Sequence, residues 1–217
     1  MQSIVCNPPC DWKMGLMIMS LKRKIFAGVG LSLLALAALA ASHLWPALFP
    51  PKNIDVGVAI GEKVPLDQPI RNAAGELTSL TEIACPNGTV LVLVRSAHWC
   101  PFCKVQLAND AEIAGDLDQR GYTLVSLSYD QPKKLAEFAA DMEQSYLILS
   151  DTESVFIDAV GLRDPQYSED HFAYGVPRAS VLMFSPDGTV QAKFVSADYR
   201  QRPSNEYVLR MVESAAD

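Results

Sequence analysis

Two cysteines at the start of a predicted helix are the residues best suited to chemistry in this 217-residue chain. They lie in the segment Trp99-Cys100-Pro101-Phe102-Cys103. A cysteine at a helix N-terminus lies beside unpaired backbone N–H groups and the positive end of the helix dipole. Both features stabilise a thiolate, so we expect Cys100 to have a lowered pKa and to be the nucleophile.

Cys103 follows Cys100 by one helical turn, on the same side of the predicted helix. Its sulfur can attack a mixed disulfide or a sulfenic acid on Cys100 and close an intramolecular disulfide. Pro101 suits the first helical turn, where a missing N–H costs little. Trp99 is expected to form an apolar wall beside the nucleophile. The segment therefore predicts a redox-active pair of thiols.

Two other interpretations of this pair remain open. A zinc site usually needs a second cysteine pair or two histidines, and only His98 and His171 follow residue 54. We expect no metal and no cofactor. The pair could also be purely structural. His98 and Lys104 are expected to face solvent, and Cys85 to be an unpaired loop thiol without a function.

The segments around the pair predict an α/β domain. Residues 89–94, directly before the motif, form an uninterrupted apolar run that is typical of a strand buried on both faces. The motif opens a predicted helix over residues 100–119. We also expect a hairpin within residues 64–80, strands over 122–127, 146–149, 180–184 and 190–195, and helices after Asp130 and over 154–160 and 204–214. This alternation favours a mixed central sheet with helices on both faces.

The N-terminal segment predicts a membrane anchor. Residues 22–24 are basic, and residues 25–41 carry no charge. We expect residues 1–24 to be cytoplasmic, residues 25–49 to span the membrane as a signal anchor, and a domain over residues 55–217 to be extracytoplasmic, periplasmic if the source is bacterial. Residues 38–40 are typical of a cleavage site, so a cleaved signal and secretion are the alternative.

The start of the chain is a separate question. A signal segment normally begins with its basic region, and Met19 directly precedes it. Met14, Met17 or Met19 could be the true start, in which case Cys6 and Cys10 are not translated. We assign these two cysteines no role.

Charge and cysteine content exclude other classes of protein. The chain carries 18 basic and 25 acidic residues, a net charge of -7. Five of the basic residues but one acidic residue precede Asp55, so the remainder has a net charge of about -11. Such a surface disfavours nucleic acid as a partner. Five cysteines are too few for a disulfide scaffold.

The strand, residues 95–103 and the following helix together resemble the thioredoxin-like superfamily. More specifically, they resemble its alkyl hydroperoxide reductase C / thiol-specific antioxidant branch of peroxiredoxin-like redoxins. The resemblance extends over residues 58–212 and includes residues 61–65, 67–80, 126–130 and 149–151. It implies a thioredoxin-like fold and an antioxidant oxidoreductase that reduces peroxides. An external thiol would then reduce the disulfide Cys100–Cys103.

Residues 178–184, followed by Asp187-Gly188, resemble the segment that carries an arginine beside the peroxidatic thiol. The resemblance implies that Arg178 stabilises the thiolate and polarises a peroxide oxygen. The alternative is a surface arginine in a loop. Pro177 is the candidate for the cis-proline of thioredoxins. Counting back from Asp187-Gly188 places Ala179 there instead, which leaves a cis Val176–Pro177 peptide bond open.

One departure from the family pattern bears on the substrate. Peroxiredoxins usually carry proline and threonine seven and three residues before the nucleophile, where this chain has Leu93 and Ala97. The missing threonine hydroxyl favours protein disulfide exchange as the alternative to peroxide reduction. Arg95 could supply a substitute contact to substrate. A non-enzymatic interaction module is the remaining alternative.

Overall fold

The computed structural model describes residues 37–38, 40, 50–142 and 146–216. The chain separates into two compact units, Met1–Pro50 and Pro51–Asp217. Within the described residues, no helix is both long and apolar enough to cross a membrane. The predicted cytoplasmic segment lies outside these residues, as does the predicted anchor over 25–49 except for residues 37, 38 and 40.

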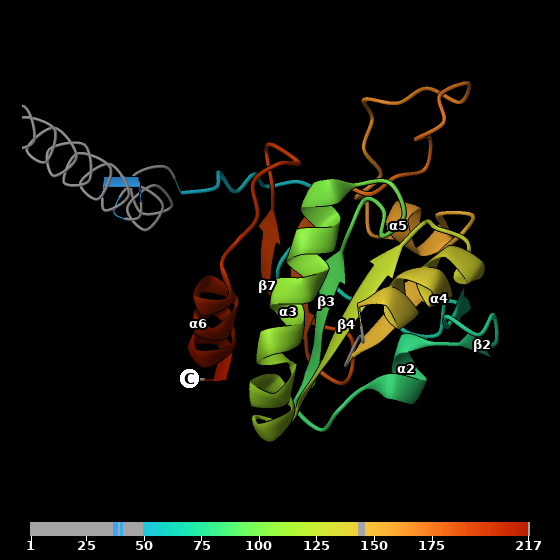
Figure 1. The fold of residues 1–217 in the computed structure, drawn as a ribbon. Helices are drawn as coiled ribbons and strands as arrows, with labels where there is room; N and C mark the ends of the chain where they lie inside the picture. The colour runs from blue at the N-terminus through green and yellow to red at the C-terminus, as the bar shows by residue number, and fades with distance from the viewer. Residues whose placement is uncertain (1–36, 39, 41–49, 143–145, 217) are drawn as a thin grey trace, which may run out of the picture. The chain divides into compact units, whose positions relative to one another are not determined.

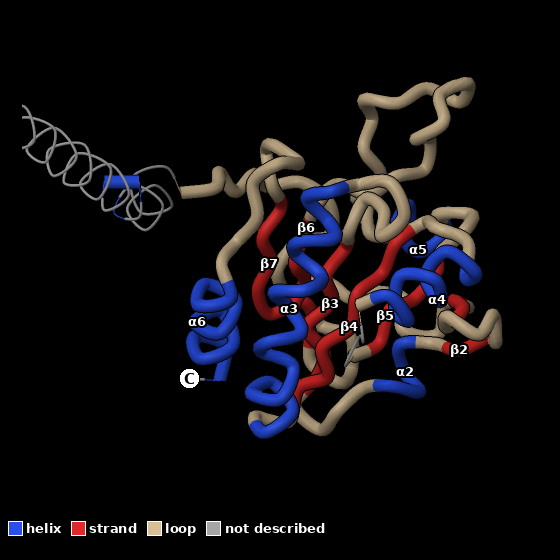
Figure 2. The backbone as a smooth tube through the Cα atoms, viewed as in Figure 1, coloured by secondary structure: helices blue, strands red, loops and turns tan. Residues whose placement is uncertain are grey.

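A seven-stranded sheet forms the centre of the second unit, in the order β2-β1-β5-β4-β3-β6-β7 (Figures 1 and 2). Its three inner strands run parallel, and the strands flanking them pair antiparallel. The strands are β1 (Ile70–Arg71), β2 (Leu77–Thr78), β3 (Gly88–Leu93), β4 (Tyr122–Ser128), β5 (Leu147–Ser150), β6 (Ser180–Phe184) and β7 (Val190–Val195). The predicted mixed sheet is confirmed, with a shorter N-terminal hairpin than the sequence indicated.

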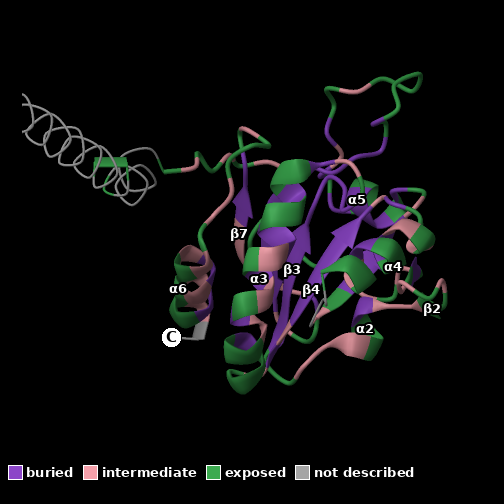
Figure 3. Ribbon diagram, in the orientation of Figure 1, coloured by how far each residue is buried: buried purple, intermediate pink, exposed green. Residues whose placement is uncertain are grey.

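Helices cover both faces of this sheet, as predicted. One apolar core joins the sheet to α3 (Pro101–Gln119), α4 (Pro132–Asp141) and α6 (Asn205–Ala216). The core on the other face includes residues of α2 (Leu80–Ile83) and α5 (Val155–Ala159). Figure 3 shows the buried strands between exposed outer helix faces. Sequence analysis missed α2, because four residues show no helical period.

Strand β3 places the cysteine motif at the middle of the fold. Val90 and Val92 point into the core under α3, whereas Leu91 and Leu93 point into the opposite core. All six residues of β3 are buried, which explains the uninterrupted apolar run. Because β3 lies between β4 and β6, the residues that follow it emerge in the middle of the sheet edge that the ends of these strands form.

Helix α3 begins and ends where the sequence predicts. Cys100 is the N-cap, and Pro101 occupies the first turn. Cys103 and Leu107 are fully buried, so this face of the helix packs on the sheet. Gly121 follows the helix with φ +78°, and a Cβ there would lie 2.7 Å from the side-chain nitrogen of Asn87. Glycine therefore allows the chain to turn into β4 here at a low cost in free energy, whereas a larger residue would be strained.

A loop of residues 160–179 connects α5 to β6 and extends beyond the sheet edge (Figure 1). Within the described residues, no peptide bond is cis. The Val176–Pro177 bond is therefore trans, which answers the question that the sequence left open.

Candidate active site

Cys100 and Cys103 meet at the N-terminus of α3. Their Sγ atoms lie 2.7 Å apart, and both are free thiols. The two residues are 1% and 0% exposed. A disulfide needs a sulfur–sulfur distance of about 2.05 Å, so a small movement would join them. The tertiary structure thus keeps the two sulfurs together and away from bulk water.

A guanidinium group lies beside this pair. Nη2 of Arg202 is 3.5 Å from Sγ of Cys103. The pKa of Cys103 is lowered to about 6, first by the hydrogen bond from Cys100 and further by the charge of Arg202, against the opposing effect of burial. The pKa of Cys100 is raised, first by its hydrogen bond to Cys103 and then by burial.

The expectation that Cys100 has the lowered pKa is therefore wrong for the reduced pair. The helix N-terminus does favour a charge on Cys100, because the backbone N–H of Cys103 lowers its pKa. That lowering is smaller than the opposing rise in the Cys100 pKa. The rise comes from the two sulfurs sharing one proton while the Arg202 cation lies on the Cys103 side. The pair loses its first proton readily and holds the negative charge on Cys103.

Arg202 is a residue that sequence analysis missed. It lies between β7 and α6, where no motif or period marks it. Its Nε donates a 2.5 Å hydrogen bond to Oε1 of Gln106, and its Nη1 donates to the carbonyl oxygen of Tyr199. These contacts hold the guanidinium against α3, where it reaches Cys103.

Asp110 is a buried carboxyl group on the same face of α3, two turns beyond Cys103. It is 4% exposed, and its Oδ2 has no hydrogen-bond partner among the described residues. Burial raises its pKa to about 7, and the charge of Arg202 opposes that rise. The cysteine pair therefore has a buried titratable carboxyl group on the same face of its helix.

The loop that leads into the motif is clamped to the end of β4. Ser96 Oγ donates to Oδ1 of Asp130 at 2.8 Å, and the Ala97 N–H donates to Oδ2 at 2.7 Å. Ser96 Oγ also accepts the backbone N–H groups of His98 and Trp99. The clamp fixes the backbone immediately before Cys100.

Trp99 is half-buried beside the cysteine pair. Its Nε1 donates to the hydroxyl of Tyr129 at 3.1 Å, and its ring packs edge-on against Phe172 with centroids 5.4 Å apart. Phe172 belongs to the loop between α5 and β6 and is 74% exposed. This loop therefore contributes an aromatic surface next to Trp99, whose contact with substrate stays a prediction.

Arg95 is buried, with 2% exposure, among aromatic rings. Its guanidinium carbon lies 3.9 Å from the ring centroid of Tyr199, 5.2 Å from that of Tyr167 and 5.5 Å from that of Trp99. It donates to the Tyr167 hydroxyl, but its Nε has no hydrogen-bond partner within the described residues. Its contact with substrate stays a prediction.

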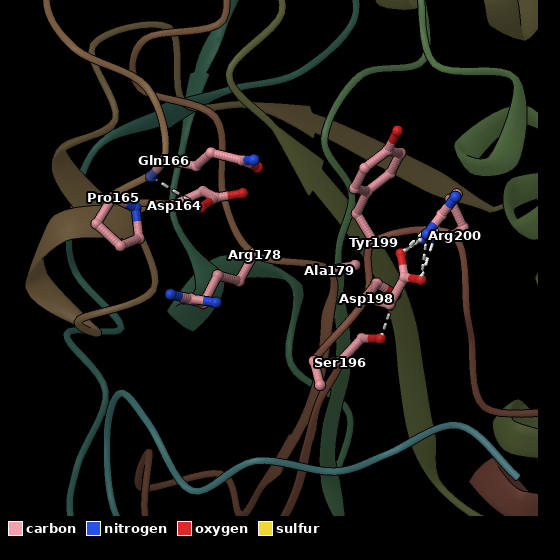
Figure 4. A pocket seen from close by; sticks show the side chains of 10 residues that line it. Asp164, Pro165, Gln166, Arg178, Ala179, Ser196, Asp198, Tyr199 and Arg200 are labelled. Carbon is pink, nitrogen blue, oxygen red and sulfur yellow. Dashed lines mark hydrogen bonds and ion pairs between the residues drawn. The ribbon is translucent and has the colours of Figure 1, made fainter.

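Arg178 and Pro177 lie elsewhere at the same sheet edge. Arg178 lines a pocket of about 600 Å³ (Figure 4), and no hydrogen bond in the described part of the chain joins its side chain to either thiol. Pro177 is buried and forms a bridge with Arg163. Pro101 is exposed at the start of α3. The catalytic role of Arg178 and the substrate contacts of both prolines stay predictions.

The remaining candidates lie outside the pair. His98 and Lys104 are exposed, as expected. Cys85 is a free, half-buried thiol in the turn before β3. Across the described residues, no three His, Cys, Asp or Glu side chains are arranged to hold a metal ion.

Comparison with known proteins gives consistent similarities. Residues 60–193 match the AhpC/TSA family. The chain is 24% identical over 165 residues to a 1-Cys peroxiredoxin of Medicago truncatula, and 25% identical over 166 residues to 1-Cys peroxiredoxin PER1 of Hordeum vulgare. Each alignment covers 73% of both proteins.

Solved structures show the same fold. A mutant of peroxiredoxin 6 from Arenicola marina has a TM-score of 0.65 at 19% identity, covering 74% of each chain. Peroxidoxin BcpB from Mycobacterium tuberculosis has a TM-score of 0.61 at 17% identity, covering 73% of this chain and 97% of that one. With the family match extending over more than half of the sequence, the chain belongs to the AhpC/TSA family of thioredoxin-like, thiol-dependent oxidoreductases.

Proposed function

We propose that this protein reduces peroxides with Cys100 as the attacking thiol and Cys103 as the resolving thiol. The observation that carries the proposal is the 2.7 Å separation of the two sulfurs beside the guanidinium of Arg202. One negative charge is stabilised on the pair, and the second thiol is already within bonding reach.

The first half of the reaction uses the proton shared by the pair. The Cys103 thiolate takes the proton of Cys100 across the short contact, and the Cys100 sulfur attacks the nearer peroxide oxygen. A sulfur–oxygen bond forms and the oxygen–oxygen bond breaks. The leaving alkoxide takes the proton from Cys103 and departs as an alcohol, so Cys100 becomes a sulfenic acid.

The second half closes the pair. The Cys103 thiolate attacks the Cys100 sulfur, a disulfide forms, and hydroxide leaves as water after protonation from solvent. Each peroxide takes two electrons from the pair. An external thiol reductant returns them by thiol–disulfide exchange. The curated relatives are named 1-Cys peroxiredoxins, whereas in this proposal the resolving thiol lies in the same chain.

Stopped-flow fluorescence of Trp99 with hydrogen peroxide tests the proposal, because the indole adjoins the reacting sulfur. We expect Cys100→Ser to abolish the fast phase. Cys103→Ser should accumulate a sulfenic acid that dimedone traps, while Cys85→Ser, the matched control, should react as the natural protein does. Wild-type peroxide turnover by Cys100→Ser would overturn the proposal.

Protein disulfide exchange is the second candidate function. Ala97 is buried and lacks the hydroxyl that the resemblance leads one to expect near the nucleophile. Phe102 is 41% exposed and Phe172 is 74% exposed beside the pair, which suits contact with a protein chain. Reaction of the reduced protein with a model protein disulfide faster than with peroxide would favour this function.

We also propose that residues 25–49 anchor the protein in a membrane, with the domain over residues 55–217 on the side away from the cytoplasm. The basic residues 22–24 and the uncharged run after them support this arrangement. Alkaline extraction of membranes from cells that express the full chain should leave it in the pellet, and protease added outside the membrane should degrade residues 55–217. Release by alkali would contradict the anchor.

A further inference from the structure

The sheet brings two arginines from distant parts of the sequence to one edge. Leu93, the last residue of β3, pairs with Ser180, the first residue of β6. Because these strands are antiparallel, Arg95 and Arg178 each lie two residues beyond that pair at the same end of the sheet. Ser180 also pairs with Val195, so the segment after β7 leaves from this edge as well.

A pocket of about 600 Å³ opens at this edge (Figure 4). Asp164, Gln166 and Arg178 line one side of it, and Tyr199 and Arg200 line the other. This volume is sufficient for a small organic molecule. The pocket therefore joins the loop before β6 to the segment after β7.

Arg178 is the cation without a counter-ion in this pocket. Arg200 forms an ion pair with Asp198 at 2.9 Å. The Asp164 carboxylate accepts the backbone N–H of Gln166. The side chain of Arg178 has no hydrogen bond or ion pair with any described residue, and it is half-buried. The guanidinium group of Arg178 is therefore free to donate hydrogen bonds to an anion that enters the pocket.

Arg95 adds a second cation behind the pocket wall. It packs on the ring of Tyr199, which lines the pocket, and its Nε has no hydrogen bond within the described residues. No ion pair joins Arg95 to a carboxylate in the described part of the chain, although the protein carries a net charge of -7. Because it is buried, the charge of Arg95 is weakly screened by solvent.

The same wall adjoins the cysteine pair. The ring of Tyr199 packs edge-on against Phe102, with centroids 6.0 Å apart. The Tyr199 carbonyl oxygen accepts a hydrogen bond from Nη1 of Arg202, and Nη2 of the same arginine lies 3.5 Å from Sγ of Cys103. Tyr199 therefore lines the pocket and also contacts Phe102, which lies between the two cysteines, and Arg202, the cation beside Cys103.

We propose that this pocket binds the carboxylate of an organic hydroperoxide whose peroxide end reacts at Cys100. Arg178 binds the carboxylate directly, and Arg95 attracts it through the wall. The carboxylate itself does not react, so the oxidation and reduction steps are unchanged. The inference deepens the proposed peroxidase function and rests on it.

A matched pair of hydroperoxides tests this subsite. Hexyl hydroperoxide and 6-hydroperoxyhexanoate share a six-carbon chain and differ in the carboxylate. We expect wild-type protein to reduce the acid with a kcat/KM about tenfold or more above that of the neutral compound. Raising salt from about 0.02 M to about 0.5 M should lower that preference, because screening weakens the attraction.

Arg178→Met should bring the ratio of the two kcat/KM values, acid over neutral hydroperoxide, down close to one, whatever its effect on the absolute rates. Arg178→Lys should restore part of it through the retained charge. Arg210→Met is the matched control, because it removes the same charge from α6, where Arg210 pairs with Glu206. Equal rates for the two hydroperoxides, or a preference that survives Arg178→Met, would overturn the inference.

Calorimetric titration with hexanoate separates this inference from the function on which it rests. Hexanoate should bind wild-type protein and Arg210→Met, and should not bind Arg178→Met. If neither hydroperoxide is reduced, the peroxidase proposal fails, and hexanoate binding alone then decides whether an anion site exists. Absence of hexanoate binding to an active wild-type enzyme would overturn the subsite alone.

Discussion

Nη2 of Arg202 lies 3.5 Å from Sγ of Cys103, although 99 residues separate them in sequence. The contact places a positive charge that lowers the pKa of both thiols on the segment that leads into the last helix. Together with the hydrogen bond between the two sulfurs, it stabilises the negative charge on Cys103 rather than on the helix N-cap.

Arg202→Met is expected to raise the pKa of the first thiol to ionise by about 1–3 units, because an opposite charge at this distance favours thiolate by that amount. The thiolate absorbance at 240 nm, followed against pH, measures it. Arg202→Lys should recover part of the shift. Arg120→Met, which removes a cation paired with Glu213 at the far end of α3, should leave the titration unchanged. An unchanged titration in Arg202→Met would contradict the assignment.

Asp110→Asn is expected to flatten the dependence of stability on pH between about 4 and 7. The folded carboxyl has a pKa of about 7, above its unfolded value of about 3.9, so the folded protein holds a proton that the unfolded chain has lost. The contribution of this group to the free energy of unfolding is therefore fully present below about pH 4. It is lost as pH rises through 7, a loss of about 4 kcal/mol.

Urea unfolding of wild type and Asp110→Asn at several pH values measures the effect. The stability difference between the two proteins should change steadily in favour of the variant as pH rises through this window. A constant difference from pH 4 to 7.5 would show that Asp110 does not titrate there.

Asp130→Asn is expected to lower the free energy of unfolding by about 3 kcal/mol and to slow the reaction of Cys100. The buried carboxylate accepts hydrogen bonds from Ser96 on one oxygen and from Ala97 and Ser128 on the other. Asparagine keeps one accepting oxygen, but its amide nitrogen cannot accept the hydrogen bonds at the other position, so at least one buried donor loses its partner. Chemical denaturation and stopped-flow kinetics measure the two effects. Asp116→Asn, an exposed change on α3, is the control and should alter neither.

Gly88→Ala is expected to destabilise the fold by more than about 2 kcal/mol. Gly88 has φ +124°, and a Cβ there would clash with the carbonyl oxygen of Phe184 on the neighbouring strand. Gly115→Ala, in an open position on α3, should instead stabilise by about 0.5–1 kcal/mol. Thermal unfolding of both variants compares them directly, and equal melting temperatures would refute the backbone argument.

Local sequence patterns were sufficient for most of the secondary structure. The uninterrupted apolar run predicted β3 because a strand buried on both faces excludes polar residues from either side. The position of Pro101 predicted the start of α3, and Gly121 its end. The four-residue helix α2 was not predicted, because so short a segment shows no helical periodicity of apolar residues.

The candidate site divides in the same way. Cys100 and Cys103 are adjacent because a helix brings residues one turn apart to one side, which is a local relation that sequence spacing determines. Their protonation depends on Arg202, and the pocket depends on strand register that joins Arg95 to Arg178. Only the tertiary structure decides these, because electrostatic attraction depends on distance in space and the chain folds distant segments together.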